Sequence, residues 1–231
     1  MDLLVQYQKT ELDCQVQKAH PCGMKAGRGS GSRSLTARGA ATRSRIVDAA
    51  AGLIYAQGVE RTSLDQVMEQ SGVSKSQLYH YFTDKDALVL EVIRLQTDRV
   101  LGAQQPHIDR LDSLQGLRSW RDAVIQLNQQ VRGGGCPLGS LANELAKNSE
   151  GARKRLASGF GTWTDQLERG LVTMHARGDL VSTADPHELA IALLSAVQGG
   201  LLLAKTTKSN RALEIAIDMA IAHVANHMKK A

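Results

Sequence analysis

Residues 62–85 constrain the fold more than any other stretch of this chain. They predict two short helices joined by a tight turn at Gly72, followed by the start of a third helix. Glycine supplies the backbone freedom that such a turn needs. Val67, Val73 and Leu78 stand where a helix-turn-helix packs its two helices together. The segment therefore predicts a helix-turn-helix motif.

The second helix of this motif is expected from Lys75 to Phe82, with its start at Ser74. Tyr81 and Phe82 share the face of Leu78, so they are predicted to be core residues. The predicted outward-facing residues all donate hydrogen bonds to phosphates or to base edges, and they are Lys75, Ser76, Gln77, Tyr79 and His80. This pattern indicates a protein that binds double-stranded DNA.

The composition favours an all-α fold. The chain has 231 residues, of which 42% are hydrophobic and only 3% are aromatic, so the core is expected to consist of Leu, Val, Ile and Ala. Such a core favours helices over sheets. Periodicity and helix-start signals predict about nine helices and no strand. The net charge of +5 gives a mild preference for a polyanionic partner.

The sequence predicts a cytoplasmic protein without a membrane partner. The longest apolar run, Leu189–Ala204, is interrupted by polar residues and glycines and is too short to span a bilayer. The N-terminus lacks the apolar centre of a signal peptide. Cys14, Cys22 and Cys136 are an odd number without framework spacing, which fits a reducing compartment.

Three regions are expected along the chain: a disordered basic tail (1–41), a DNA-binding domain (42–88) and a larger helical domain (89–231). Six basic and no acidic residues stand between Met24 and Arg45, across the end of this tail. Two interpretations of it remain open. It is either an arm that lies along DNA, or a solvated tail or upstream extension before a natural start at Met24.

Helix-start signals recur through the sequence. Ser63 with Gln66, and Ser74 with Gln77, have the spacing of a capping box. A further helix is predicted from Thr83, capped through Asp86, to about Gln105. Later helices are expected over 117–131, 137–147, 150–177, 186–205 and 210–229.

The segment from Thr42 to Ile93 resembles the TetR family of bacterial transcriptional regulators. The most specific match is the pattern GVSKxxLYxYFxxKxxL from Gly72 to Leu88. The segment GCPLGSLANELA (135–146) is similar to a subgroup with LmrA/YxaF-like C-terminal domains. The resemblance implies a small N-terminal DNA-binding domain and a variable helical domain, usually in a repressor.

The expected DNA contacts follow from position and from the resemblance. By position, Gln77 pairs bidentately with adenine and Lys75 reaches guanine acceptors. The resemblance adds Tyr79 and His80 as contacts and Lys85 as a phosphate clamp, with Ser63 in the equivalent role at the preceding helix. Lys75 and Lys85 are alternatively ordinary surface lysines.

One such motif contacts too few bases, so a homodimer on a palindromic operator is expected. The resemblance implies that the last two helices form the dimer surface. Gly199 and Gly200 weaken their own helix by about 1 kcal/mol each. Close approach of a partner subunit compensates for this, or alternatively close packing within one chain.

The larger domain is expected to bind an unknown small-molecule effector that favours the state unable to bind DNA. Trp120, Phe160 and Trp163 are candidate pocket residues, with plain core filling as the alternative. Cys136 is predicted at a helix N-terminus, where the helix dipole favours a reactive thiolate. The alternative is a buried, inert thiol.

No catalytic motif is present, so neither an enzyme nor a cofactor is predicted. His223 and His227 have metal-ligand spacing but no third ligand, and Cys14, His20 and Cys22 are a weak zinc set. No metal site is therefore predicted. Two alternatives remain: a protein-interaction module of the same fold, and an enzyme that uses Cys136.

Overall fold

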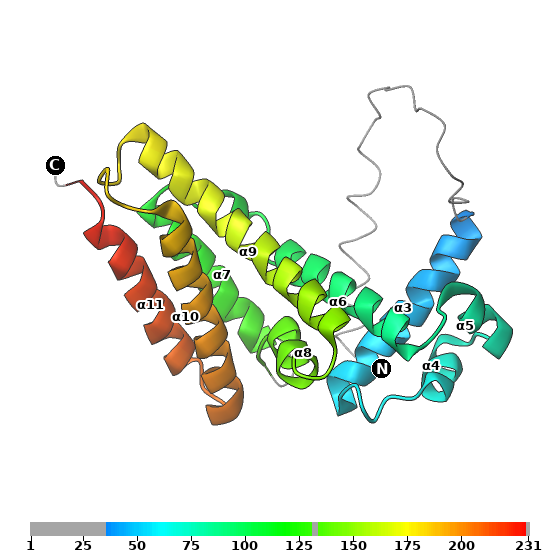
Figure 1. Cartoon of the computed structure of the whole chain (residues 1–231). Helices are drawn as coiled ribbons and strands as arrows, with labels where there is room; N and C mark the ends of the chain where they lie inside the picture. The colour runs from blue at the N-terminus through cyan, green and yellow to red at the C-terminus, as the bar shows by residue number, and fades with distance from the viewer. Residues whose placement is uncertain (1–35, 131–133, 230–231) are drawn as a thin grey trace, which may run out of the picture. The chain divides into compact units, whose positions relative to one another are not determined.

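The computed structural model describes residues 36–130 and 134–229. The chain divides after Ala40 into two units, and the second, residues 41–231, contains the helix-turn-helix and the larger helical domain. Nine α-helices occur in the described ranges, which confirms the all-α prediction (Figure 1). They are α3 (Ala37–Gln57), α4 (Leu64–Ser71), α5 (Lys75–Tyr81), α6 (Lys85–Gly102), α7 (Leu114–Gln130), α8 (Pro137–Leu145), α9 (Glu150–Arg177), α10 (Pro186–Thr207) and α11 (Arg211–Asn226), with one 3-10 turn, η1 (His107–Asp109).

Helices α3 and α6 hold the helix-turn-helix in place. Both bury Leu, Val, Ile and Ala side chains in the core. Two ion pairs join them: Arg43 to Glu91 at 2.9 Å and Arg99 to Asp48 at 2.5 Å. Burial raises the pKa of Glu91, but hydrogen bonds from Arg43 and Arg94 outweigh it, so the net pKa is lowered and the carboxylate stays charged.

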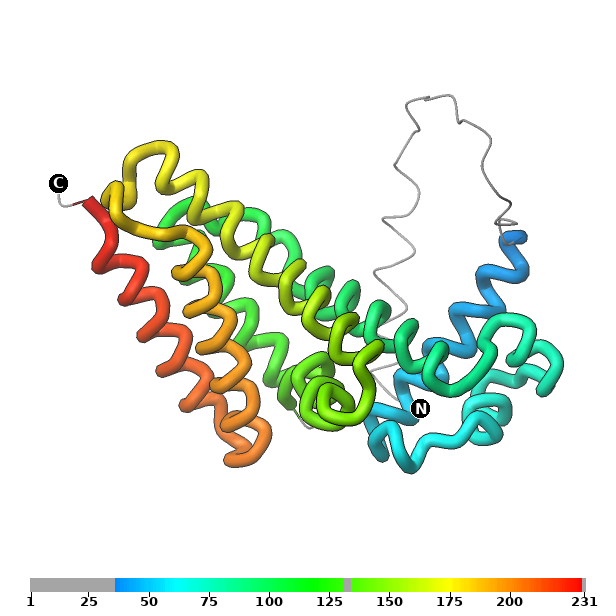
Figure 2. Tube along the Cα trace, viewed as in Figure 1, coloured from blue at the N-terminus to red at the C-terminus, as the bar shows by residue number. Residues whose placement is uncertain are grey.

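The remaining helices form a bundle in which α10 packs against both α9 and α11, and α11 packs against α7 (Figure 2). The helix ends follow local sequence signals. The Asp185 carboxylate caps α10 by accepting from the His187 and Glu188 amides, and Gly178 ends α9 in the left-handed conformation. At Gly200 of α10 an added Cβ would lie 2.7 Å from Leu213 Cα of α11, so the glycine allows these helices to approach closely.

By length and composition alone, α10 is the helix in the described ranges that is apolar enough to cross a membrane, with a mean hydropathy of 1.6 over 18 residues. The helix spans Pro186–Thr207, close to the predicted range 186–205, and contains the apolar run Leu189–Ala204. Of that window, 44% is buried inside the bundle. This burial is typical of a core helix, and α10 packs against α9 and α11.

Several predicted helix boundaries were wrong. Helix α3 starts at Ala37, so its first residues fall within the predicted tail, 1–41. Asp84, not Thr83, caps α6 by accepting from the Ala87 amide at 2.7 Å. Helix α6 ends at Gly102, short of Gln105. The chain after α9 also forms an isolated antiparallel bridge between Leu180 and Met228, although no strand occurs in the part of the chain that is described.

Candidate nucleic-acid interface

The turn between α4 and α5 has the predicted geometry. The Ser63 hydroxyl accepts from the Gln66 amide at 3.2 Å, and the Gln66 side chain accepts from the Ser63 amide at 2.9 Å, which completes a capping box at the start of α4. Gly72 follows α4 in the left-handed conformation, at φ 65° and ψ 34°, which glycine adopts without the steric cost of a Cβ. The expected role of Gly72 in the turn is confirmed.

A second capping box fixes the start of α5. The Gln77 amide donates to the Ser74 hydroxyl at 3.3 Å, and the Ser74 amide donates to Gln77 Oε1 at 2.9 Å. One of the two acceptor positions of Gln77 Oε1 is therefore used inside the protein. Bidentate pairing of Gln77 with adenine consequently relies on its Nε2 together with the position that remains.

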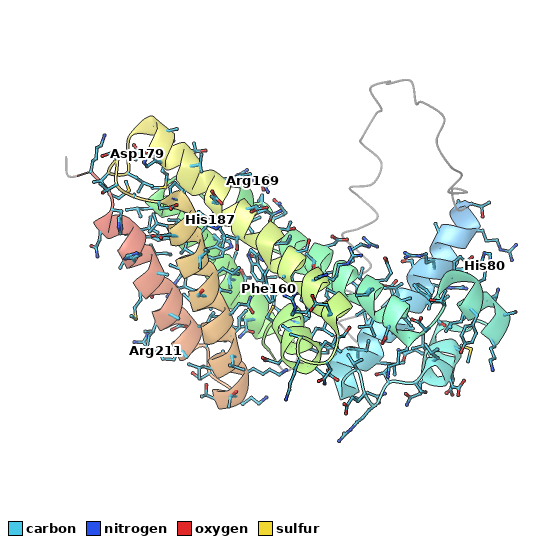
Figure 3. All side chains as sticks on the ribbon, in the orientation of Figure 1. His80, Phe160, Arg169, Asp179, His187 and Arg211 are labelled. Carbon is cyan, nitrogen blue, oxygen red and sulfur yellow. The ribbon has the colours of Figure 1, made fainter. Side chains whose placement is uncertain are left out.

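The two faces of α5 divide as predicted. Leu78 is fully buried, Phe82 is buried and Tyr81 packs partly against the core. The opposite side is exposed to solvent at every predicted position, namely Ser74, Lys75, Ser76, Gln77, Tyr79 and His80. His80 projects from this part of the molecule in Figure 3, and its ring makes an edge contact with Tyr81 at 4.8 Å between centroids. This exposed set is called the reading face.

Ser63 and Lys85, two predicted phosphate contacts from different helices, line one small surface hollow. Lys85 is the first residue of α6, and its Nζ donates to the Glu60 carbonyl at 3.4 Å. The exposed Ser63 stands at the start of α4. A helix start and a neighbouring cation are a suitable arrangement for one phosphate group.

Comparisons with known proteins give the family. A model described as bacterial regulatory proteins, tetR family, matches residues 46–92, and one described as tetracyclin repressor-like, C-terminal domain, matches residues 110–220. An HTH-type transcriptional regulator from the lacX 3' region of Lactococcus lactis subsp. lactis is 30% identical over 77% of this chain and 90% of its own length. The chain belongs to the TetR family. It is thus a DNA-binding transcriptional regulator rather than an enzyme, and it acts inside the cell.

Other relatives support the same assignment. YxaF of Bacillus subtilis is 27% identical over 78% of this chain and 92% of its own length. LmrA of the same organism is 24% identical over 74% and 90%. A TetR regulator from Chloroflexus aurantiacus shares the fold with a TM-score of 0.71 at 23% identity, covering 85% of this chain and all of that one. A Cytophaga hutchinsonii regulator gives 0.74 at 18% identity, over 86% and 100%.

The predicted effector residues of this TetR regulator lie apart from its larger cavity. Trp120 is fully buried, and its indole N–H donates to Gln104 Oε1 at 2.9 Å. Trp163 is also buried, and its Nε1 has no hydrogen-bond partner among the described residues. Phe160 packs partly against the core from α9 (Figure 3). Core filling therefore accounts for Trp120, and none of these aromatic residues lines the cavity of about 210 Å³ between α3, α6, α8 and α10.

Cys136 stands at the N-cap of α8 as predicted, and its surroundings fit the buried, inert thiol rather than the reactive thiolate. The residue is buried with 8% exposed, and its sulfur accepts from the Gly139 amide at 3.4 Å. Burial raises the pKa of the thiol and outweighs the lowering by this helix-start amide. Loss of hydration destabilises the thiolate more than the helix-start amides stabilise it, so the thiol stays protonated.

The structure separates the two glycines predicted at the dimer surface. Gly200 is buried against Leu213 of its own chain, which fits the alternative of close packing within one chain. Gly199 is exposed, with open space where a Cβ would stand.

The rings of His223 and His227 contact each other, but the described residues contain no cluster of three or more His, Cys, Asp or Glu side chains that could hold a metal ion. Cys14, His20 and Cys22 lie outside them.

Sequence reasoning missed Glu144. Its carboxylate, on α8, accepts from the Val59 amide at 2.5 Å and the Glu60 amide at 3.2 Å, in the loop that leads to α4. No sequence signal connects residues so far apart.

Proposed function

We propose that the chain is a homodimeric repressor that reads a palindromic operator and is released by a small-molecule effector. The observation that carries the proposal is the reading face: α5 buries Leu78 and turns its hydrogen-bonding side chains to solvent. A recognition helix enters the major groove with its N-terminal residues at the bases. Residues 42–88 provide DNA contacts, and residues 89–231 provide self-association and effector binding.

Each residue of the reading face has a proposed role. Lys75 and Gln77, in the first turn of α5, contact base edges, with guanine and adenine as the matching bases. Ser74, Ser76, Tyr79 and His80 contact phosphates or a thymine methyl group. Ser63 and Lys85 contact phosphate groups, which is supported by their places at the starts of α4 and α6.

A dimer is supported by apolar side chains that the single chain leaves exposed on its last two helices. They are Ile191, Leu202 and Leu203 on α10, and Ile215 and Met219 on α11. Together with Gly199 they form what we call the apolar stripe. Covering such side chains removes apolar area from water at about 25 cal/mol per Å². A second copy of this chain is the proposed cover, because two-fold operators require two reading faces.

Release by a small molecule is preferred over release by thiol modification. Cys136 is buried and its raised pKa keeps the thiol protonated, whereas modification requires an accessible thiolate. An effector acts only through its different affinities for the operator-bound and free states. The proposed effector site is the one predicted at Phe160 and Trp163.

The test is fluorescence anisotropy with a duplex from the DNA upstream of the protein's own gene. The full chain should bind specifically, and log K should fall linearly with log salt by about 0.9 per phosphate contacted. Footprinting should then show two half-sites separated by about one helical turn, roughly 10 base pairs. Binding that ignores salt, or a footprint with one half-site, contradicts the proposal.

A further inference from the structure

A cavity of about 210 Å³ lies where α3, α6, α8 and α10 meet. Its wall is about equally polar and apolar, and the apolar part comes from Ala51 and Ile54 of α3, Val92 of α6 and Leu141 of α8. This volume is below the range of about 300–1,000 Å³ typical of pockets for drug-sized ligands. The cavity therefore suits a smaller molecule with an apolar body.

Gln96 gives this cavity a buried polar group. It lines the cavity from α6 with only 8% of its surface exposed. Its side-chain amide has no hydrogen-bond partner in the ranges that the structure covers. An amide without a protein partner at the wall of a cavity is available to hydrogen-bond a molecule inside it. Gln96 thus points to a ligand with a hydrogen-bonding end.

The mouth of the cavity carries an unpaired positive charge. Lys205 Nζ donates to Ser140 Oγ at 3.5 Å, and both residues line the cavity. The Lys205 stem passes over Gly135, where an added Cβ would come within 2.8 Å of Lys205 Cδ. No carboxylate within salt-bridge distance of Lys205 is found in residues 36–130 and 134–229.

The one acidic residue in the lining, Glu144, does not neutralise this lysine. Its Oε1 is directed at the Val59 and Glu60 amides. The cavity therefore offers an ammonium, a hydroxyl and an amide as hydrogen-bond donors beside the apolar side chains of Ile54 and Val92. Donors that converge beside a cation are the usual partners of a carboxylate.

We infer that this cavity is a binding site for a small monocarboxylate, with the carboxylate at Lys205, Ser140 and Gln96 and the apolar body against Ile54 and Val92. The site is distinct from the aromatic residues predicted for the effector. Its occupation would affect operator binding only if the proposed function holds. The site itself needs no DNA, so failure of this inference and failure of the proposed function are separable.

The test uses benzoate as the probe and benzamide as its uncharged, isosteric control, titrated into the full chain. Methyl NMR signals of Ile54 and Val92 report on the cavity. Benzoate should shift both signals in a saturable manner, and benzamide should bind at least about tenfold more weakly, because a charge-assisted hydrogen bond is lost.

Two variants and a control complete the design. Lys205→Gln and Gln96→Leu should each weaken benzoate binding about tenfold. Lys147→Gln, which removes a charge from an exposed lysine outside the cavity lining, should leave binding unchanged. Unshifted methyl signals at tens of millimolar benzoate, equal binding of benzamide, or an unaffected Lys205→Gln variant would overturn the inference.

Discussion

Gln77 is both a structural residue and a proposed base reader, and a substitution can separate the two roles. Gln77→Ala removes the capping box at Ser74 as well as the base contact. Gln77→Glu keeps the box, because glutamate serves equally at this position, but it presents only acceptors. We expect Gln77→Glu to lose adenine at the contacted position, with a discrimination change of about 1–3 kcal/mol, and to favour cytosine.

Selection from operators with randomised half-sites measures this change, with circular dichroism to verify that the helices are intact. Gln77→Ala should show relaxed base choice together with lower thermal stability. If Gln77→Glu selects the same operator as the parent protein, Gln77 does not read bases and acts only as a cap.

Lys85 should behave differently, because phosphates carry no sequence information. Lys85→Ala is expected to weaken all duplexes alike and to reduce the slope of log K against log salt by about 0.9, the value for one phosphate. The matched control is Lys147→Ala, an exposed lysine in the turn after α8. Anisotropy titrations at several salt concentrations decide the matter. A change of base preference in Lys85→Ala would contradict a phosphate role.

Residue types and spacing predicted the reading face because its requirements are local. A Ser followed three residues later by Gln forms a capping box wherever a helix starts, and alternation of Leu78 with polar neighbours settles which side is buried. The role of Glu144 was not predictable, because its partners at Val59 and Glu60 lie more than 80 positions away in sequence. The pKa of Cys136 likewise depends on burial by distant helices.

At the scale of helices, adjacent glycines in α10 should respond in opposite ways to the same change. An added Cβ at Gly200 meets the Leu213 backbone at 2.7 Å, whereas at Gly199 it meets open space. Gly200→Ala should therefore lose stability, because strain of about 1–3 kcal/mol exceeds the gain in helix propensity. Gly199→Ala should gain up to about 1 kcal/mol. Chemical denaturation of both variants checks this, and equal effects would disprove close packing of α10 on α11.

The contact between α9 and α10 should be pH-dependent through His187. Its Nδ1 lies 2.8 Å from Glu168 Oε2, and this hydrogen bond, with the charges of Glu168, Asp185 and Asp165, raises the pKa of His187 (Figure 3). A raised folded-state pKa stabilises the fold fully below the unfolded value of about 6.5, and the effect is lost as pH rises through the folded value.

The melting temperature of the parent should therefore exceed that of His187→Asn at about pH 6 and approach it at about pH 9. Glu168→Gln should remove most of this pH-dependent difference, because it leaves His187 without its partner. A difference between parent and His187→Asn that is the same at both pH values would show that packing, and not charge, is responsible.

Helix boundaries were predicted most accurately where the sequence carries a strong start or stop signal, and least accurately where it does not. Asp185 with Pro186 located the start of α10, and Gly178 located the end of α9. Pro106 predicted that α6 ends at about Gln105, but the helix already ends at Gly102 and a turn connects it to the proline. The cavity beside Gln96 was not foreseen, because the sequence does not specify how α3, α6, α8 and α10 pack together.

For the whole molecule, operator recognition should depend on the apolar stripe. Met219 is 68% exposed on α11 in the single chain. In a two-fold dimer, Met219→Glu places two unpaired carboxylates against apolar surface, which costs several kcal/mol. We expect dimer dissociation to become at least about a hundredfold more favourable, and operator affinity to fall because a monomer reads one half-site.

The control is Val172→Glu on α9, an apolar residue with 46% exposed that lies outside the apolar stripe. Sedimentation velocity and footprinting should show monomers and lost protection for Met219→Glu alone. A dimer that tolerates Met219→Glu but dissociates with Val172→Glu would move the interface to α9.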